Sequence, residues 1–163
     1  MLDVVPFRAE HQDGVVALIL EIQRGEFGMP ITAEQQPDLM QIPAYYQVRS
    51  GNFWVALSGA RVVGTISLLD IGDGQGALRK MFVQRDFRGA ATGTAQRLLD
   101  SLLAWCGARA LREIFLGTTP HFHAAHRFYE KNGFDEIAKT DLPRAFPIME
   151  VDTKFYRRRI ERA

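Results

Sequence analysis

The chain has 163 residues, a formal net charge of +1, and 47% hydrophobic and 24% charged side chains. These values are typical of a single globular domain over residues 1–163 and argue against a general nucleic-acid binder. Because Cys106 is the only cysteine, no apolar run reaches about 18 residues and no signal-peptide pattern opens the chain, we expect a soluble, cytoplasmic protein without a membrane partner.

The first third of the chain is predicted to form an edge strand, a helix and an irregular segment. Residues 2–8 are strand-like, and Pro6 restricts this strand to a sheet edge because proline cannot donate a ladder hydrogen bond. Apolar residues then recur at helical spacing from about His11 to Arg24. Further prolines divide the next segment into short helical pieces, Pro37 to Ile42 and Pro43 to Arg49.

The middle of the chain is predicted to form three strands joined by two hairpins. These strands are Phe53 to Leu57, Val62 to Leu69 and Ala77 to Val83. The glycine-rich segment from Gly72 to Gly76 precedes a strand rather than a helix, so we interpret it as a turn and not as a dinucleotide-binding motif.

The last part of the chain alternates helices and strands. The predicted elements are a helix from about Thr92 to Ala108, a strand from Arg112 to Gly117, a helix from Ala124 to Asn132, and strands from Phe134 to Ala138 and Ile148 to Phe155. Gly133 follows the second helix at the position where glycine commonly ends one.

A run of small residues between the third hairpin strand and the long helix is the most informative stretch. From Gly89 to Gly93 no side chain is larger than threonine, so a ligand can approach the backbone closely. The first amides of the following helix lack intrahelical acceptors, and the helix dipole adds partial positive charge there. With Arg88 as a further cation, this turn is predicted to bind the phosphates of a cofactor.

A second pattern follows this turn and leads to a family. After the strand ending Leu116-Gly117-Thr118, a helix carries Ala125 and Tyr129 and is followed by Gly133-Phe134. Together with the turn Arg88-Gly89-Ala90-Ala91-Thr92-Gly93 and the order of elements, these residues make nearly the whole chain resemble the GNAT superfamily of N-acetyltransferases. The resemblance implies that acetyl-CoA is the co-substrate, that a small amine or peptide accepts the acetyl group directly, and that no metal is required.

The resemblance also implies the fold and the position of the cofactor. We expect an α/β (α+β) fold, namely a GNAT-like mixed, twisted sheet of six to seven strands flanked by about four helices. A cofactor cleft is expected where strands 4 and 5 splay apart. Polar backbone left unpaired by such a splay needs a ligand or water.

The residues that the resemblance assigns to acetyl-CoA lie on both sides of this cleft and at the turn. They are Met81, Phe82 and Val83 on one strand, Leu116, Gly117 and Thr118 on the next, Ala125 and Phe128 on the following helix, and Arg88, Gly89, Ala90, Ala91, Thr92, Gly93 and Thr94 at the turn. The amide of Phe82 or Val83 is expected to polarise the thioester carbonyl, and the hydroxyls of Thr92 and Thr94 to donate to phosphate oxygens.

Two positions depart from the family pattern. Ala91 replaces a usual glycine, which costs on the order of 1 kcal/mol if the position needs a positive φ. Phe122 stands where many members have an asparagine. Both departures support an alternative function, a non-catalytic acyl-CoA sensor or interaction module, and a preference for longer acyl groups is a third possibility.

Tyr129 is the residue that the resemblance assigns as general acid to the departing thiolate. A tyrosine hydroxyl has an ordinary pKa near 10 and can supply a proton to sulfur. The alternative is that Tyr129 is simply a packed core aromatic. The general base is less clear from the sequence, which offers ordered water or one of several acids: Glu21, Glu26, Asp38 and Asp70.

The remaining reactive side chains suggest no further chemistry. His121, His123 and His126 lack the spacing of a metal site, and Cys106 is expected to be buried. Between Glu10 and Gln41 six acids accompany only Arg24, which favours either a solvated face or an entrance for cationic or aromatic amines. Family members often dimerise, so a homodimer is possible.

Overall fold

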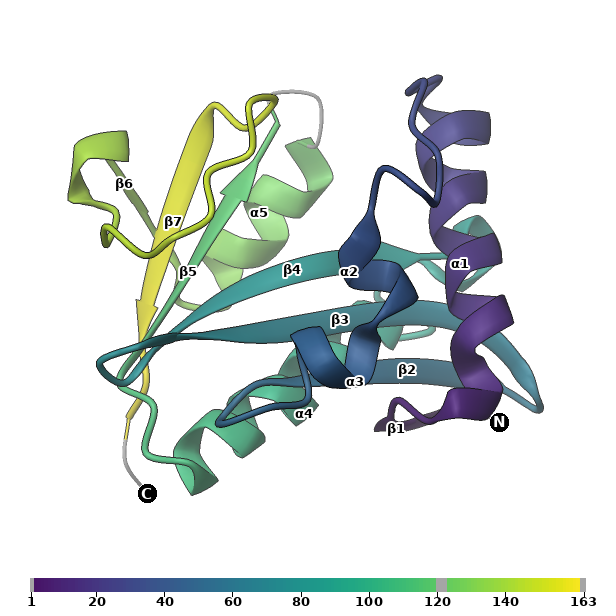
Figure 1. Cartoon of the computed structure of the whole chain (residues 1–163), viewed down its shortest axis with the longest axis horizontal. Coiled ribbons are helices and arrows are strands. Elements are labelled where there is room, and N and C mark those ends of the chain that lie inside the picture. The colour runs from purple at the N-terminus through teal and green to yellow at the C-terminus, as the bar shows by residue number, and fades with distance from the viewer. Residues whose placement is uncertain (1, 120–122, 162–163) are drawn as a thin grey trace.

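The computed structural model of this chain describes residues 2–119 and 123–161, and within them seven strands form one sheet in the order β1-β2-β3-β4-β5-β7-β6 (Figure 1). The strands are β1 (Leu2–Pro6), β2 (Asn52–Ser58), β3 (Arg61–Gly72), β4 (Gln75–Val83), β5 (Glu113–Thr118), β6 (Asp135–Ile137) and β7 (Lys154–Arg159). The α-helices are α1 (Gln12–Leu20), α2 (Pro37–Met40), α3 (Ile42–Tyr45), α4 (Thr94–Ala108) and α5 (His123–Lys131). This mixed sheet with flanking helices confirms the expected fold.

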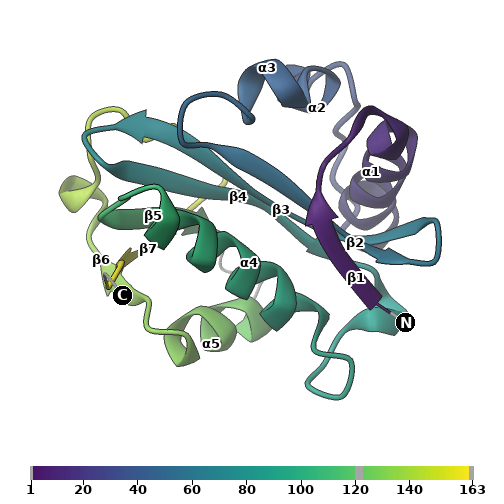
Figure 2. The same cartoon turned by 90° about the horizontal axis from the view of Figure 1, so that it is seen from below.

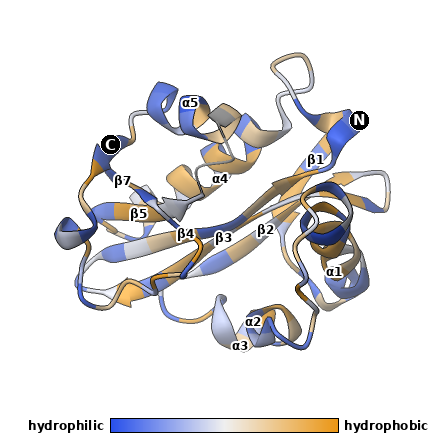
Figure 3. Cartoon of the chain, turned by 90° about the horizontal axis from the view of Figure 1, so that it is seen from above, coloured by the Kyte–Doolittle hydropathy of each residue, from blue (hydrophilic) through white to orange (hydrophobic). Residues whose placement is uncertain are grey.

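The helices cover the two faces of the sheet unequally. Figure 2 shows α1, α2 and α3 on one face and α4 and α5 on the other. Helix α1 buries Val15, Leu18 and Ile19, and Figure 3 shows both hydrophobic and hydrophilic residues along it. A six-residue π-helical segment, η2 (Glu21–Glu26), continues α1. The two faces therefore have separate cores.

Strands β4 and β5 are paired over only a short length. Their parallel ladder joins Gln75–Ala77 to Glu113–Phe115, after which the strands diverge (Figure 1). Strand β5 continues in contact with β7 along its whole length, and β4 remains paired with β3. Among residues 2–119 and 123–161, the edge of β4 that faces β5 thus has no strand partner beyond Ala77, which confirms the splay expected between strands 4 and 5.

A bulge bends β4 within this free edge. Lys80 has a φ of +55°, and the register between β3 and β4 shifts between the pairs at Thr65 and Ser67. Hydroxyls of β3 compensate for the interrupted ladder: Thr65 Oγ1 donates to the carbonyl of Lys80 at 2.7 Å, and Ser67 Oγ donates to that of Arg79 at 2.8 Å.

The predicted last strand, Ile148 to Phe155, is wrong. Strand β7 runs over Lys154–Arg159, and Ile148 and Val151 are exposed outside it. Pairing with β5 and β6 determines where β7 begins and ends. This pairing buries Phe155 and Tyr156, and Arg157 to Arg159 form the last residues of the strand. Among the helices of the described ranges, none has the length and apolar character needed to cross a membrane.

Candidate functional site

The small-residue turn before α4 has the backbone of an anion site. Gly89 and Gly93 have φ values of +98° and +65°, and no side chain caps the start of α4. Ala91 is exposed and is not among the non-glycine residues with positive φ, so the strain that its methyl group would cause does not arise. The free amides at the helix start and the dipole of this 15-residue helix favour negative charge here.

The two threonines of the turn do not offer their hydroxyls to a ligand, contrary to the sequence-based expectation. Thr92 Oγ1 donates within the turn, to the carbonyl of Phe87 at 2.6 Å, with the carbonyl of Gly89 at 3.1 Å. Thr94 Oγ1 is buried without a hydrogen-bond partner. The backbone of the turn, rather than these hydroxyls, is left to meet phosphate.

Arg88 is engaged by an acid from the other side of the sequence. Its Nη1 and Nη2 donate to the two carboxylate oxygens of Glu26 at 2.6 and 2.8 Å, and its Nε donates to the carbonyl of Val83 at 2.8 Å. These hydrogen bonds from Arg88 lower the pKa of Glu26. Glu26 lies on η2, so the ion pair connects the end of the α1 layer to the turn before α4.

The backbone of β4 directs alternate residues toward the free edge. The amide of Gln84 donates to the carbonyl of Val63 on β3, and the carbonyl of Val83 faces away from β3 and accepts from Arg88. Because polar groups alternate between the two edges of a strand, Val83 faces β5 and Phe82 faces β3. Of the two amides predicted to polarise the thioester, that of Val83 points toward the split and that of Phe82 toward β3.

Tyr129 lies on α5 against the end of this split. Helix α5 closes at Gly133, whose φ is +86°, and the amide of Phe134 donates to the carbonyl of Tyr129 at 3.0 Å. Phe134 and Tyr156 then pack on the Tyr129 ring, with centroid distances of 5.5 and 6.1 Å. Gly133 and Phe134 therefore fix the position of the Tyr129 side chain.

Burial determines the protonation state of Tyr129. Its side chain is 5% exposed, and burial, followed by the negative charge of Asp152, raises its pKa. Within the described ranges its hydroxyl has no hydrogen-bond partner. Tyr129 is thus held as a neutral, proton-bearing donor at physiological pH, and it is also the packed aromatic of the alternative interpretation.

The four acids considered as bases are already occupied or distant. Glu26 is paired with Arg88, and Asp70 accepts hydrogen bonds from the amides of Ser50 and Gly72 at 3.0 and 2.8 Å. Glu21 lines a shallow hollow beside the β2–β3 hairpin. Glu26 and Asp70 are therefore engaged within the fold, and Glu21 lies beside a different part of the sheet.

Asp38 belongs to a buried network beneath the β4 bulge. Lys80 Nζ lies 3.5 Å from Asp38 Oδ2, and both side chains are only 9% exposed. Tyr46 donates to the same oxygen at 2.6 Å, and Lys80 donates to Gln36 Oε1 at 2.8 Å. Asp38 therefore neutralises the lysine at the bulge and is not a free base.

Arg79 connects two segments above the α1–α3 face of the sheet. Its Nη1 donates to the Tyr45 hydroxyl at 3.1 Å, and its Nη2 contacts Met149 Sδ at 3.8 Å. Met149 belongs to the segment that leads into β7, and Phe146 of that segment packs on β5 and β7 with Phe115 and Phe155. A cation thus lies between α3 and the segment before β7, next to the split.

Asp152 is a site residue that the sequence analysis missed. Its carboxylate lies against Gly117 of β5, where a methyl group would come 2.7 Å from Oδ2. Burial raises the pKa of Asp152 to about 6, although the positive charge of Arg79 opposes the shift. The raised pKa and the position near both Arg79 and Tyr129 are the signals that distinguish it, and both require the tertiary structure.

Several other candidates lie elsewhere. Cys106 is buried, which raises its pKa to about 12, and His126 is buried with Nε2 2.9 Å from the carbonyl of Thr119. Phe122, His121 and the side chain of His123 lie outside the described residues. Across residues 2–119 and 123–161 no three His, Cys, Asp or Glu side chains gather in a way that could hold a metal.

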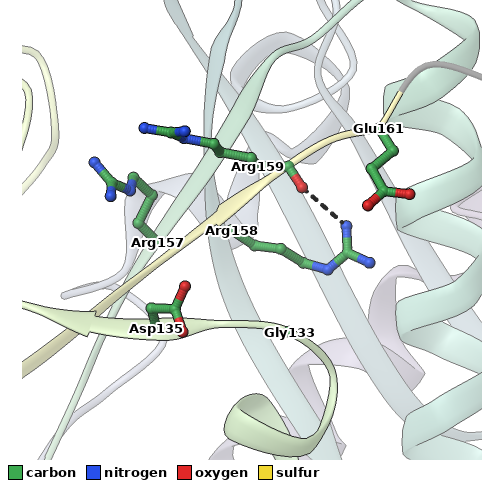
Figure 4. A pocket seen from close by; sticks show the side chains of 6 residues that line it. All are labelled: Gly133, Asp135, Arg157, Arg158, Arg159 and Glu161. Atoms are coloured by element: carbon green, nitrogen blue, oxygen red, sulfur yellow. Dashed lines mark hydrogen bonds between the residues drawn. The ribbon is translucent and has the colours of Figure 1, made fainter.

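A surface hollow beside β6 and β7 is separate from the split. Figure 4 shows that Arg158 points toward Glu161, while Arg157 and Arg159 point the other way. Arg158 donates to the carbonyls of Asn132 and Arg159. Asp135 and Glu161 offset most of the positive charge, so this hollow lacks the features of the turn before α4.

The split sheet, the uncapped helix start and the buried tyrosine define an acyl-CoA-type transferase fold. The model of the acetyltransferase (GNAT) family matches residues 16–134, and the chain belongs to this family. A crystal structure of a GNAT-family acetyltransferase from Staphylococcus aureus Mu50 has 34% sequence identity, covers 99% of this chain and 100% of its own, and superposes with a TM-score of 0.93.

Two further similarities are weaker, one in coverage and the other in sequence identity. N-acetylaspartate synthetase of Danio rerio is 34% identical over 106 residues, which are 64% of this chain but only 37% of that relative. The N-acetyltransferase PaiA of Thermoplasma acidophilum, solved in complex with coenzyme A, shares 13% identity over 98% of this chain and 99% of its own with a TM-score of 0.73, and supports the fold alone.

Proposed function

We propose that this protein transfers the acetyl group of acetyl-CoA to the primary amine of a small acceptor, with Tyr129 as general acid. The observation that carries the proposal is the β4–β5 split, because it leaves a strand edge unpaired between a helix start that favours phosphate and a buried tyrosine. Membership of the GNAT family supports the same reaction.

The acceptor is proposed to carry a carboxylate as well as its amine. Arg79 supports this, because its guanidinium lies between Tyr45 and Met149 on the face opposite α4 and α5. Arginine suits carboxylates because its planar fork can donate two parallel hydrogen bonds. The names of the N-acetylaspartate synthetase relatives are consistent with an acidic amino acid as acceptor.

The acidic segment near the N-terminus gives less support to a cationic acceptor than its sequence suggests. Of its six acids, Glu26 is paired with Arg88 and Asp38 with Lys80. Two of the six negative charges expected to attract a cationic acceptor, those of Glu26 and Asp38, are therefore neutralised by basic residues of the same chain. The carboxylate of an amino acid acceptor would instead be held by Arg79.

Release of the CoA thiol tests the proposal when it is measured against a panel of amines with and without carboxylates. We expect amine-dependent release by the wild type and a loss of about 10²–10⁴ in rate for Tyr129→Phe, with CoA binding by calorimetry unchanged. Tyr156→Phe is the matched control, because its hydroxyl binds Glu130 at 2.7 Å and its ring packs against Tyr129.

The alternative functions give different results in the same assay. CoA binding without thiol release for any amine would favour the non-catalytic acyl-CoA sensor. Equal loss in Tyr129→Phe and Tyr156→Phe would assign Tyr129 to packing alone. Absence of CoA binding would overturn the proposal as a whole.

A further inference from the structure

The two sides of β5 face different parts of the molecule. Leu116 and Tyr156 pack with Tyr129 in the core beneath α4 and α5. Phe115 and Phe155 pack with Phe146 in the core on the opposite face. Because side chains alternate along a strand, Gly117 belongs to the same face as Phe115. A group lying on Gly117 is thus on the opposite face of the sheet from Tyr129.

Asp152 is the group that lies on Gly117. A methyl group at position 117 would come 2.7 Å from Asp152 Oδ2 and 3.1 Å from Phe155 Cε1, so the glycine makes room for the carboxylate. Two backbone hydrogen bonds fix the position of Asp152. Its amide donates to the carbonyl of Met149 at 3.0 Å, and the amide of Thr153 donates to the carbonyl of Thr118 at 3.1 Å.

The carboxylate of Asp152 is not used by the fold. It is half-buried, and in the described part of the chain it has no hydrogen-bond or ion-pair partner. This distinguishes it from Glu26, Asp38 and Asp70, whose oxygens are occupied. A half-buried carboxylate that contributes no structural bond is available to a substrate.

We propose that Asp152 is the general base that takes a proton from the acceptor ammonium, a role that rests on the acetyl transfer proposed above. The carboxylate accepts one N–H proton, the amine lone pair forms the N–C bond to the acetyl carbonyl carbon, and the C–S bond breaks. Tyr129 gives its proton to the sulfur and regains one from solvent. The second N–H proton of the acceptor and the proton on Asp152 leave to solvent, so one proton is released per turnover.

The positions of Asp152 and Tyr129 suit this division of work. The amine approaches from the face that carries Arg79 and Asp152, and the sulfur leaves toward the face that carries Tyr129. Proton removal and proton donation then occur on opposite faces of the split, where neither group blocks the other.

Charge couples the two residues. The group whose charge acts on Asp152 is Arg79 of β4, and the charge of Asp152 acts in turn on Tyr129 of α5, while β5 and β7 present Gly117 and Phe155, which do not titrate. Burial raises the pKa of Asp152 to about 6, and the negative charge of Asp152 contributes to the raised pKa of Tyr129. Protonation of Asp152 removes that charge, so Tyr129 becomes a stronger acid when the thiolate needs its proton.

The pH dependence of kcat/KM for Asp152→Asn tests this role. The wild-type value is expected to fall on the acid side with an apparent pKa of about 6, where Asp152 becomes protonated. The variant is expected to lose about 10²–10⁴ in kcat near pH 7 and to recover as the pH approaches about 10, the ordinary pKa of an alkyl ammonium group. CoA binding by calorimetry is expected to be unchanged.

Glu150→Gln is the matched control, because this exposed acid is two residues away on the same segment. Asp152→Glu is the second variant, and it is expected to keep the acid limb with a lower kcat. An Asp152→Asn enzyme with the wild-type rate and pH profile would overturn the assignment while leaving acetyl transfer intact. Failure of the wild type to release thiol with any amine would overturn both proposals.

Discussion

Arg88 and Glu26, which are 62 positions apart in the sequence, form a bidentate ion pair with N–O distances of 2.6 and 2.8 Å. Arg88 is the cation of the turn that precedes α4, and Glu26 is the last residue of the π-helical segment after α1. The guanidinium assigned to a cofactor phosphate is therefore already bound to a carboxylate of the same chain.

Removal of Glu26 is expected to change CoA affinity. In Glu26→Gln the guanidinium is no longer neutralised, so we expect CoA to bind more tightly by up to about fivefold, the range of an exposed ion pair. Arg88→Ala is expected to weaken binding. Isothermal calorimetry at two salt concentrations measures both, and unchanged affinity in Arg88→Ala would remove Arg88 from the phosphate site.

Substitution of Arg79 is expected to alter the choice of acceptor. Arg79→Gln removes the charge that faces the acceptor side while keeping a donor for Tyr45. We expect KM to rise at least tenfold for amines that carry a carboxylate and to change little for amines that lack one. Steady-state kinetics on matched amine pairs make the comparison, and an equal rise for both members of each pair would contradict it.

Gly117→Ala is expected to displace Asp152 without removing its charge. The new methyl group meets Oδ2 at 2.7 Å, and Gly117 does not have a positive φ, so the effect is steric. A displacement of about 1 Å can cost about 10²-fold in rate, and we expect a loss of that order in kcat. Gly107→Ala on α4 is the control, because nothing lies within 4 Å of its Cβ position.

Removing one charge of the buried pair Lys80 and Asp38 is expected to lower the free energy of unfolding more than removing both charges does. Lys80→Met leaves the Asp38 carboxylate unpaired at low exposure, which costs about 3–5 kcal/mol. The double variant Lys80→Met, Asp38→Leu replaces both charges by apolar groups and is expected to regain most of that loss. Urea unfolding of the wild type, of the single variants Lys80→Met and Asp38→Leu, and of the double variant gives the coupling free energy.

Local signals in the sequence were sufficient for many elements. Pro6 predicts an edge strand, and β1 pairs only with β2. Gly133 predicts a helix end, and its φ of +86° closes α5 there. Such positions could be predicted because a single residue type satisfies a backbone requirement that belongs to its own segment.

Long-range pairing explains what could not be predicted. Alternation around Ile148 resembles a strand, but the ladder between β5 and β7 begins at Lys154, and Asp152 falls in the segment before it. The partner of Arg88 is equally distant, because nothing near residue 88 indicates that η2 will place Glu26 there. The acids predicted as candidate bases, Glu21, Glu26, Asp38 and Asp70, all precede β4 in the chain, whereas Asp152 falls inside the predicted strand Ile148 to Phe155.

Only three residue pairs join β4 to β5, so we expect the strands on either side of this junction to behave as two cooperative units. The meander of β1 to β4 and the ladder of β5 to β7 are each held by long antiparallel pairings, so local opening is expected at the junction before either unit unravels. A molecule that hydrogen-bonds to the facing edges of β4 and β5 beyond Ala77 replaces the backbone hydrogen bonds that the two strands do not make with each other. Slower amide exchange at the end of β5 on adding CoA would record that this sheet is completed by its ligand.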